Sequence, residues 1–132
     1  MRPRGYDVAA MGGLGRVNGL VIDGADTHAL AEFWSAILGT TIDAAEGGGH
    51  YIDLAPTDGF PILRFQRVPE SKSAKNRLHL DIEVDDVEVA IETVRGLGGS
   101  VVRPPEVEYG WTFAVLADPE GNEFCAIHRR EP

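Results

Sequence analysis

The chain has 132 residues with 43% hydrophobic content, and its 21 acidic and 12 basic residues give a formal net charge of −9. This is enough material for one domain with a core of ordinary size. The basic residues are scattered along an acidic chain, which argues against nucleic acid and anionic membrane as partners and favours a small molecule or another protein. No apolar run approaches the roughly 20 residues of a membrane span.

The amino-terminal segment 1–16, MRPRGYDVAAMGGLGR, has an apolar part that is broken by glycines and is too short for the core of a signal peptide. Its glycine-rich run, 12–15, could suggest a dinucleotide-binding loop, but such a loop follows a strand and opens a helix. Here the run precedes a predicted strand. We therefore expect a flexible leader over 1–16 and a single domain over 17–132.

The sequence is similar to itself when it is shifted by 60 residues. Gly19–Asp26, GLVIDGAD, aligns with His79–Asp86, HLDIEVDD, and both segments alternate apolar and polar residues before a final aspartate. The similarity extends to Glu32 and Glu92. A repeat of this length indicates two copies of one structural unit.

In each copy the alternating segment predicts a strand, and the aspartate at its end can cap a helix by accepting hydrogen bonds from the first free N–H groups. After Asp26, apolar residues fall at helical spacing until Gly39, which favours the left-handed end of a helix. These residues are Leu30, Phe33, Trp34, Ile37 and Leu38. Glycine-rich and proline-rich turns then separate three predicted strands, over 41–45, 50–54 and 62–68.

The second copy predicts the same elements. After Asp86 the apolar residues Val87, Ile91, Val94 and Leu97 indicate a helix that glycines end. Strands follow over 100–103, 112–117 and 123–128, separated by Pro104-Pro105 and by the turn DPEGN, 118–122. This turn is rich in oxygen donors, but it lacks the full spacing of calcium ligands, and a hairpin turn is sufficient to explain it.

These elements predict an α+β protein of two βαβββ units in tandem that form a mixed sheet with a cleft. The units span 17–68 and 77–129, and the polar linker 69–76 joins them. Each helix covers one face of its own sheet, so the other face is either covered by the second unit or left as a cleft.

The segment LHLDIEV, 78–84, places one histidine in that cleft. Side chains alternate between the two faces of a strand, so the leucines, isoleucine and valine point toward the helix. His79, Asp81 and Glu83 then point the other way. We expect His79 to face the cleft.

A doubled βαβββ unit with these motifs resembles the vicinal-oxygen-chelate superfamily, which holds the glyoxalase I, bleomycin-resistance and extradiol-dioxygenase families. The resemblance covers about residues 17–129. Its most specific parts are VIDGADTHALAEFWSAILG, FQRVPESKSAKNRLHLDIEVDD and ADPEGNEFCAI, which together are similar to glyoxalase-like proteins common in actinobacterial genomes. The resemblance implies a glyoxalase-like fold, and it also implies a homodimer, since dimers are frequent among such single-domain members.

The resemblance implies a metal-binding pattern, in which the metal enzymes of this superfamily hold a divalent ion with side chains from the first and last strands of each unit. Carried onto this chain, these positions fall on Gly19, on Leu63 or Phe65 depending on the offset, on His79 and on Cys125. Glycine has no side chain, and neither leucine nor phenylalanine binds a hard cation. Two usable ligands make an incomplete site.

Two sharper hypotheses concern His79 and Cys125. With Glu123, which shares a strand face with Cys125, they could form a zinc site, and Asp81 lies behind them. Alternatively, His79 could activate Cys125 as a nucleophile, although no orienting group is evident. We favour a third interpretation, in which His79 is a hydrogen-bonded cleft residue and Cys125 is a small buried hydrophobe. No cofactor is then required, and a divalent metal is the alternative.

Aromatic and amide side chains complete the predicted cleft, since they suit an apolar ring with a polar handle. The predicted ligand contacts are His79, Gln66, Phe65, Asp81, Tyr109 and Trp111. Gln66 is nominated by the resemblance, through the segment FQRVPE. One cysteine excludes an internal disulfide and favours the cytoplasm.

The predicted function is the binding of a small molecule, aromatic or rich in oxygen, without a complete metal site. One alternative is a divalent-metal-dependent lyase, isomerase or dioxygenase acting on a vicinal-oxygen substrate. Another is a structural or regulatory protein with no small ligand.

Overall fold

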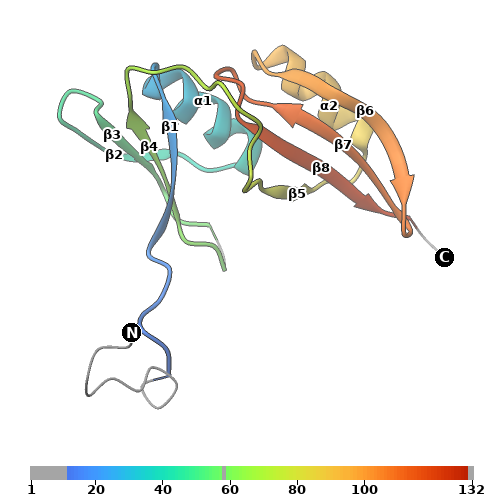
Figure 1. Cartoon of the computed structure of the whole chain (residues 1–132), viewed down its shortest axis with the longest axis horizontal. Coiled ribbons are helices and arrows are strands. Elements are labelled where there is room, and N and C mark those ends of the chain that lie inside the picture. Colours follow the sequence, from blue (N-terminus) through green and yellow to red (C-terminus); the bar gives the residue numbers. More distant parts are fainter. Residues whose placement is uncertain (1–11, 58, 131–132) are drawn as a thin grey trace.

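The computed structural model describes residues 12–57 and 59–130. Within them the chain forms a strand, a helix and three strands, and then repeats this order (Figure 1). The first unit contains β1 (Gly19–Gly24), α1 (Thr27–Leu38), β2 (Ile42–Glu46), β3 (Tyr51–Leu54) and β4 (Ile62–Arg67). The second contains β5 (Asp81–Glu83), α2 (Val87–Gly96), β6 (Ser100–Glu108), β7 (Trp111–Ala117) and β8 (Glu123–Arg129). The predicted α+β class and the tandem units are confirmed.

Each unit has its own four-stranded sheet, with the strand orders β1-β4-β3-β2 and β5-β8-β7-β6. The first strand of each unit runs parallel to the last, whereas the other neighbours are antiparallel. In the described part of the chain, no backbone pairing joins the two sheets. The predicted single mixed sheet is therefore two mixed sheets. Most of the predicted leader, 1–11, lies outside the described residues.

The predicted helix ends are confirmed. The Asp26 carboxylate accepts a hydrogen bond from the N–H of Ala29 at 3.0 Å, and one oxygen of Asp86 accepts from Glu88 and Val89 at 2.9 and 3.2 Å. Such caps satisfy N–H groups that have no partner inside the helix. Gly39 ends α1 with a φ of 65°, a left-handed conformation that costs glycine little.

Two strands differ from the prediction. β6 continues through Pro104 and Pro105 to Glu108, because register shifts between Val101 and Glu106 remove the prolines from regular pairing. β6 is also the edge of its sheet, where a missing N–H is tolerated. β5 begins only at Asp81, so His79 precedes the strand rather than lying within it.

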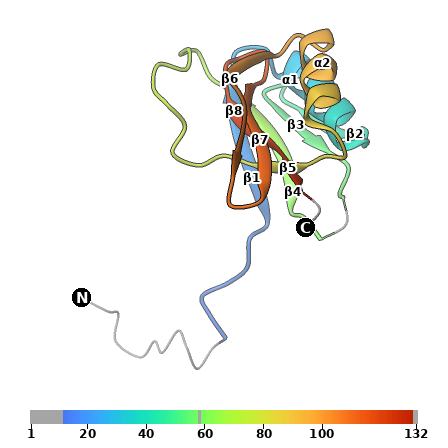
Figure 2. The same cartoon turned by 90° about the vertical axis from the view of Figure 1, so that its right-hand side faces the viewer.

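Both helices lie on the same side of the molecule, and the linker 69–76 extends on the opposite side (Figure 2). One hydrophobic core joins the helices to both sheets. Its buried members are Leu30, Ala31, Phe33, Trp34, Ile52, Leu54, Leu63, Phe65, Val87, Ile91, Val94, Ala114, Leu116, Phe124 and Ala126. The face of each sheet away from its helix is left uncovered by this core.

Aromatic rings hold the units together. The rings of Phe33 and Trp34 on α1 contact the ring of Phe124 on β8, with centroids 6.0 and 4.8 Å apart. Trp34 donates its indole N–H to the buried carboxylate of Asp118 at 3.0 Å. The units therefore share one packed interior and do not form two independent domains.

The DPEGN turn fastens the second unit to the first. The carboxylate of Glu120 accepts the backbone N–H groups of Ala25 and Asp26, just before α1, at 3.1 and 2.9 Å. Both oxygens of Asp118 already accept hydrogen bonds, from Trp34 and from donors of the turn itself. This explains the oxygen-rich sequence by hairpin geometry without calcium.

Candidate functional site

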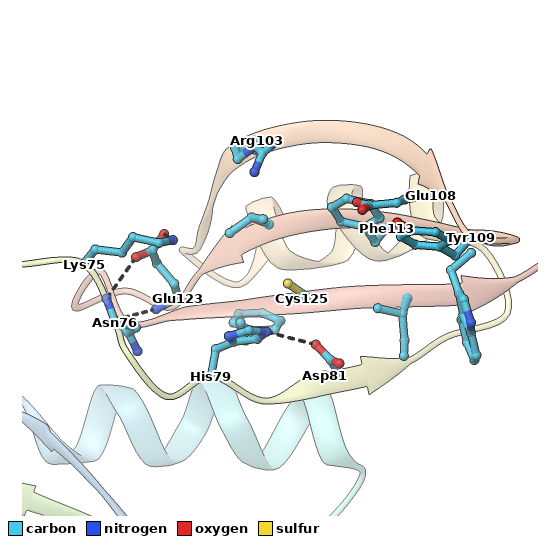
Figure 3. Close-up of a pocket in the computed structure, with 14 residues that line it drawn as sticks. Lys75, Asn76, His79, Asp81, Arg103, Glu108, Tyr109, Phe113, Glu123 and Cys125 are labelled. Atoms are coloured by element: carbon cyan, nitrogen blue, oxygen red, sulfur yellow. Dashed lines mark hydrogen bonds and ion pairs between the residues drawn. The ribbon is translucent and has the colours of Figure 1, made fainter.

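A cavity of about 520 Å³ lies on the open face of the second sheet (Figure 3). The face is set by alternation along β8, where Phe124 and Ala126 are buried in the core and Cys125 points to the cavity. Strands β5, β6, β7 and β8 and the end of the linker all contribute to its walls. The polar and aromatic side chains that line it include His79, Asp81, Cys125, Trp111, Phe113, Tyr109, Arg103, Glu108, Glu123, Lys75 and Asn76.

His79, Asp81 and Cys125 form a cluster in this cavity. Asp81 pairs with Cys125 in the register of the parallel strands β5 and β8, which brings the two side chains together. The Nε2 atom of His79 lies 3.3 Å from Oδ1 of Asp81, as Figure 3 shows. One potential ligand atom from each of the three residues lies within 4.8 Å of the others. The predicted position of His79 in the cleft agrees with this placement.

Cys125 is poorly suited to act as a nucleophile here. Burial raises the pKa of its thiol, and the negative charge of Asp81 raises it further. Because the thiolate is the reactive form, both effects suppress reactivity at neutral pH. The nucleophile hypothesis therefore loses its physical basis, since the neighbour that dominates electrostatically is a carboxylate and not an imidazolium.

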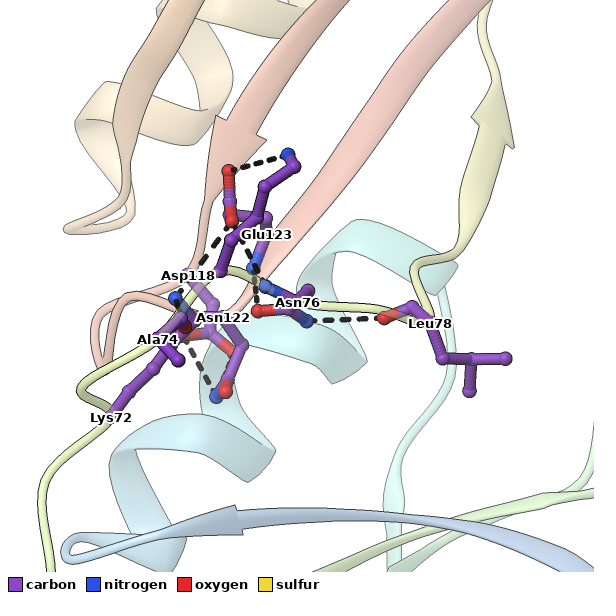
Figure 4. Close-up of polar contacts among 8 residues, drawn as sticks. Lys72, Ala74, Asn76, Leu78, Asp118, Asn122 and Glu123 are labelled. Carbon is purple, nitrogen blue, oxygen red and sulfur yellow. Dashed lines mark hydrogen bonds and ion pairs between the residues drawn. The ribbon is translucent and has the colours of Figure 1, made fainter.

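Glu123 is held away from the cluster by the linker. Its carboxylate accepts a hydrogen bond from the backbone N–H of Asn76 at 3.3 Å and lies 3.8 Å from the ammonium groups of both Lys72 and Lys75. Figure 4 shows Glu123 beside Asn76 of the linker. These partners occupy it at one end of the cavity. In the structure it is Asp81, rather than the predicted Glu123, whose potential ligand atom lies with those of His79 and Cys125.

Aromatic side chains form the opposite end of the cavity. Tyr109 and Gly110 make the two-residue turn between β6 and β7, with φ values of 49° and 83°. Positive φ at both positions is the geometry that matches the twist of a hairpin. Tyr109 is 93% exposed at the rim. Trp111 lines the wall, with the guanidinium of Arg129 lying 5.5 Å from its ring centroid.

The sequence analysis missed several lining residues. Phe113 shares a face with Trp111 because the two are separated by one residue on β7, and this alternation was readable in the sequence. The sequence did not indicate that Arg103 and Glu108 would line the cavity. Glu108 faces the cavity because β6 continues past its prolines, whereas Arg103 lies within the predicted strand 100–103 and its orientation toward the cavity was not predicted.

Phe65 and Gln66 do not line this cavity. Phe65 is fully buried in the core beneath α1, so its predicted contact with a ligand is corrected: the alternation of β4 points it toward the helix. Gln66 has the opposite orientation, on the open face of the first sheet, beside Asp23 and Tyr51 in the strand register. The two sheets thus carry separate open faces.

Strand register identifies the true counterpart of Cys125 in the first unit. Val21 pairs with Arg64 in the first sheet as Asp81 pairs with Cys125 in the second, and Val21 and Asp81 are 60 residues apart. Arg64 therefore replaces the predicted Leu63 or Phe65 at the superfamily's ligand position. The shift arises because the second unit has one extra residue between its first and last strands.

Arg64 is engaged by Asp53. The Nε and Nη2 atoms of its guanidinium donate to the two carboxylate oxygens at 2.6 and 2.9 Å. This hydrogen bonding lowers the pKa of Asp53 below its ordinary value. Gly19 occupies the other ligand position of this unit, and a Cβ there would approach the carbonyl oxygen of Ile62 to 3.0 Å. A cation and a missing side chain do not fit a metal shared by the two units.

The similarity to known proteins agrees with this architecture. The profile of the Glyoxalase-like domain matches residues 19–127. No protein of curated function matches the sequence. Among solved structures, a glyoxalase/bleomycin resistance protein/dioxygenase family enzyme from Burkholderia phytofirmans PsJN has a TM-score of 0.70 at 20% identity, covering 85% of this chain and 97% of its own.

Two further structures extend the comparison. A glyoxalase/bleomycin resistance protein/dioxygenase from Nocardioides has a TM-score of 0.69 at 18% identity, covering 93% of this chain and 90% of its own. TnmS3, an antibiotic binding protein from Streptomyces sp. CB03234, has a TM-score of 0.65 at 20% identity, covering 88% of this chain and 97% of its own. At these identities the structures show the fold alone. Because the family profile spans most of its length, the chain belongs to the glyoxalase-like domain family.

Proposed function

We propose that this protein binds a small aromatic or oxygen-rich molecule in the cavity of the second sheet, without a complete metal site. The observation that carries the proposal is the cavity itself: about 520 Å³ in volume, with aromatic side chains at one end and His79 and Asp81 at the edge formed by β5. Ligand sites of this size combine apolar walls with a few polar groups that fix orientation. An antibiotic-binding protein among the structural neighbours supports the same function.

The chemistry of the wall defines what would fit. Phe113 and Trp111 offer ring faces for stacking, while His79 and Asp81 offer a donor or acceptor pair at the edge formed by β5. Glu123 is already paired with lysines of the linker, and Arg103 with Glu106. A flat ring system with hydroxyl or carbonyl groups would satisfy both parts of the cavity.

The second candidate function is that of a divalent-metal lyase, isomerase or dioxygenase. The superfamily's four ligand positions do not fit a metal in this chain, but His79, Asp81 and Cys125 place three donor atoms together within the second unit alone. Three protein donors with one open position are typical of catalytic zinc. If bound, such an ion would polarise a substrate oxygen.

Measuring bound metal in the wild-type protein and in variants separates the two functions. The purified protein is washed with chelator, incubated with zinc, nickel, manganese or iron, and analysed for bound metal. We expect no stoichiometric uptake. Stoichiometric binding that is lost in both His79→Ala and Asp81→Asn would contradict the metal-independent function, and Glu83→Gln serves as the control because Glu83 lies on the same strand without lining the cavity.

A ligand screen then tests binding directly. Aromatic natural products are screened by thermal shift, since a ligand that binds only the native state raises the melting temperature. A hit is expected to lose its shift in Phe113→Ala and His79→Ala and to keep it in Glu83→Gln. Hits that are insensitive to both cavity variants would contradict the proposed site.

We also propose that the protein is a cytoplasmic homodimer. Val21 and Tyr51 on the open face of the first sheet are 47% and 40% exposed, and burying them against a second copy would be favourable. Cys125 is free, which suits a reducing compartment. Light scattering of the purified protein gives the mass directly, and a monomer at micromolar concentration would contradict the dimer. No helix among the described residues is long and apolar enough to cross a membrane.

A further inference from the structure

A second cavity, of about 450 Å³, lies on the helix side of the molecule, away from the cavity described above. Its walls come from α1 and α2, and its floor from β5, β7 and β8. Ile37 of α1 and Val89, Ala90 and Thr93 of α2 line its walls, and Asp85 and Asp86 lie at its rim. We call it the helix groove. The floor residues Leu116, Phe124 and Ala126 belong to the core, so the groove reaches the apolar interior.

The internal repeat explains why this space is empty. At a shift of 60 residues, Ala90 and Thr93 of α2 stand where α1 has Leu30 and Phe33. Leu30 and Phe33 are fully or almost fully buried and fill their side of the core. Because Ala90 and Thr93 are smaller than Leu30 and Phe33, α2 leaves a space beside the core that the equivalent side chains of α1 fill. The groove therefore follows from a specific difference between the two copies of one unit.

The ionisable side chains that line the groove are both acidic. Asp85 and Asp86 stand at its rim, whereas no lysine, arginine or histidine within 12–57 and 59–130 lines it. One oxygen of Asp86 accepts both capping N–H groups of α2. Among the described residues, the other oxygen of Asp86 and the carboxylate of Asp85 have no ion-pair partner. Apolar walls with two carboxylates at the mouth complement an apolar molecule that carries a positive charge.

We propose that the helix groove binds a compact apolar amine, with its hydrocarbon part against the solvent-accessible side chains of Ile37, Val89 and Ala90 and its ammonium group at Asp85 and Asp86. The volume lies within the range of about 300–1,000 Å³ that small-molecule sites occupy. Burial of the apolar surface of the amine supplies most of the affinity. The aspartates select the charge, because an anion of the same shape would meet two carboxylates.

Two probes of one shape test the charge selection. The full chain is titrated with 1-aminoadamantane, which is a cation at pH 7, and with adamantane-1-carboxylate, which is an anion, while backbone amide shifts are followed by NMR. We expect saturable shifts at Val89, Ala90 and Ala36 with the amine. The carboxylate is expected to bind at least about tenfold more weakly, the ratio that follows from about 1.4 kcal/mol.

Variants locate the site. Ala90→Leu places the side chain of Leu30 at the equivalent position of α2 and should abolish amine binding by filling the groove. Thr93→Leu fills it from the rim and serves if Ala90→Leu fails to fold. Asp85→Asn should weaken amine binding by up to about fivefold, the upper end for an exposed ion pair. Glu92→Gln, an exposed change on the same helix outside the groove, should leave binding unchanged.

Three results would overturn the inference. The first is equal affinity for both probes, which removes the charge selection. The second is the absence of saturable shifts with either probe. The third is amine binding that survives Ala90→Leu or that shifts Trp111 and Cys125, which would place it in the other cavity. None of these results contradicts the ligand site proposed on the open face of the second sheet, because that site is tested separately by Phe113→Ala and His79→Ala.

Discussion

The open faces of the two sheets have diverged although their units share one plan. In the first unit, Arg64 and Asp53 pair with each other and Gly19 offers no side chain, so the positions that correspond to Cys125 and His79 carry no free ligand group. In the second unit, the equivalent face carries the His79 cluster and a cavity. The two units therefore keep the same strand order and share one core, while the clustered side chains His79, Asp81 and Cys125 lie on the second sheet alone among the described residues.

The largest effect should come from breaking what the two units share. Phe124→Ala removes a buried ring that packs on both Phe33 and Trp34, and such a deletion costs about 3–5 kcal/mol. Urea unfolding should remain a single transition with a lower midpoint, because the units share one core. Val102→Ala, at a side chain 47% exposed, should change stability by less than about 0.5 kcal/mol. Two separate transitions in the wild-type protein would show independent units.

A smaller effect should follow from cutting the polar tie between the units. Asp118→Ala leaves the buried indole N–H of Trp34 without its acceptor, and an unsatisfied buried donor costs about 1–3 kcal/mol. The change also removes acceptors within the DPEGN turn. Equilibrium unfolding measures the loss, and Asp43→Ala, at an exposed position, is the matched control. A loss no larger than that of the control would mean that the tie contributes nothing to stability.

The ion pair on the first sheet should contribute less and should depend on pH. The pKa of Asp53 is lowered in the folded state, so its stabilisation is complete above the unfolded value of 3.8 and is lost as the pH falls through the lower folded value. Because both side chains are partly exposed, Asp53→Asn should cost no more than about 1 kcal/mol at pH 7. Unfolding measured from pH 7 down to pH 3 should show this difference shrinking. A constant difference would contradict the assignment to the ion pair.

Alternation and capping made the fold readable from the sequence. Asp26, Asp86 and Gly39 mark helix ends. Each acts on the backbone of its immediate neighbours, so its effect can be predicted from the adjacent sequence. The site was less readable because it depends on strand register. One extra residue in the second unit moved the counterpart of Cys125 from Leu63 or Phe65 to Arg64, and no local pattern reveals such a shift.

Tertiary partners explain the remaining differences. Glu123 has the right residue type and strand face for a ligand, yet the linker lysines and the backbone of Asn76 hold it. Glu108 joins the cavity because β6 continues through two prolines, as irregularities at a sheet edge. Both outcomes depend on segments that are distant in sequence or irregular in conformation, which periodicity does not describe.

The smallest predicted effect tests the cluster on the second sheet. Burial and the charge of Asp81 both raise the pKa of the Cys125 thiol, so Asp81→Asn should lower that pKa and increase the thiolate fraction near neutral pH. Alkylation by iodoacetamide at pH 8 should accelerate about twofold to threefold, since the thiolate is the reacting form. Glu83→Gln removes a carboxylate from the same strand outside the cavity and should leave the rate unchanged. Equal rates in Asp81→Asn and wild type would mean that the carboxylate does not act on the thiol, and the contrast between the two open faces would then depend on shape alone.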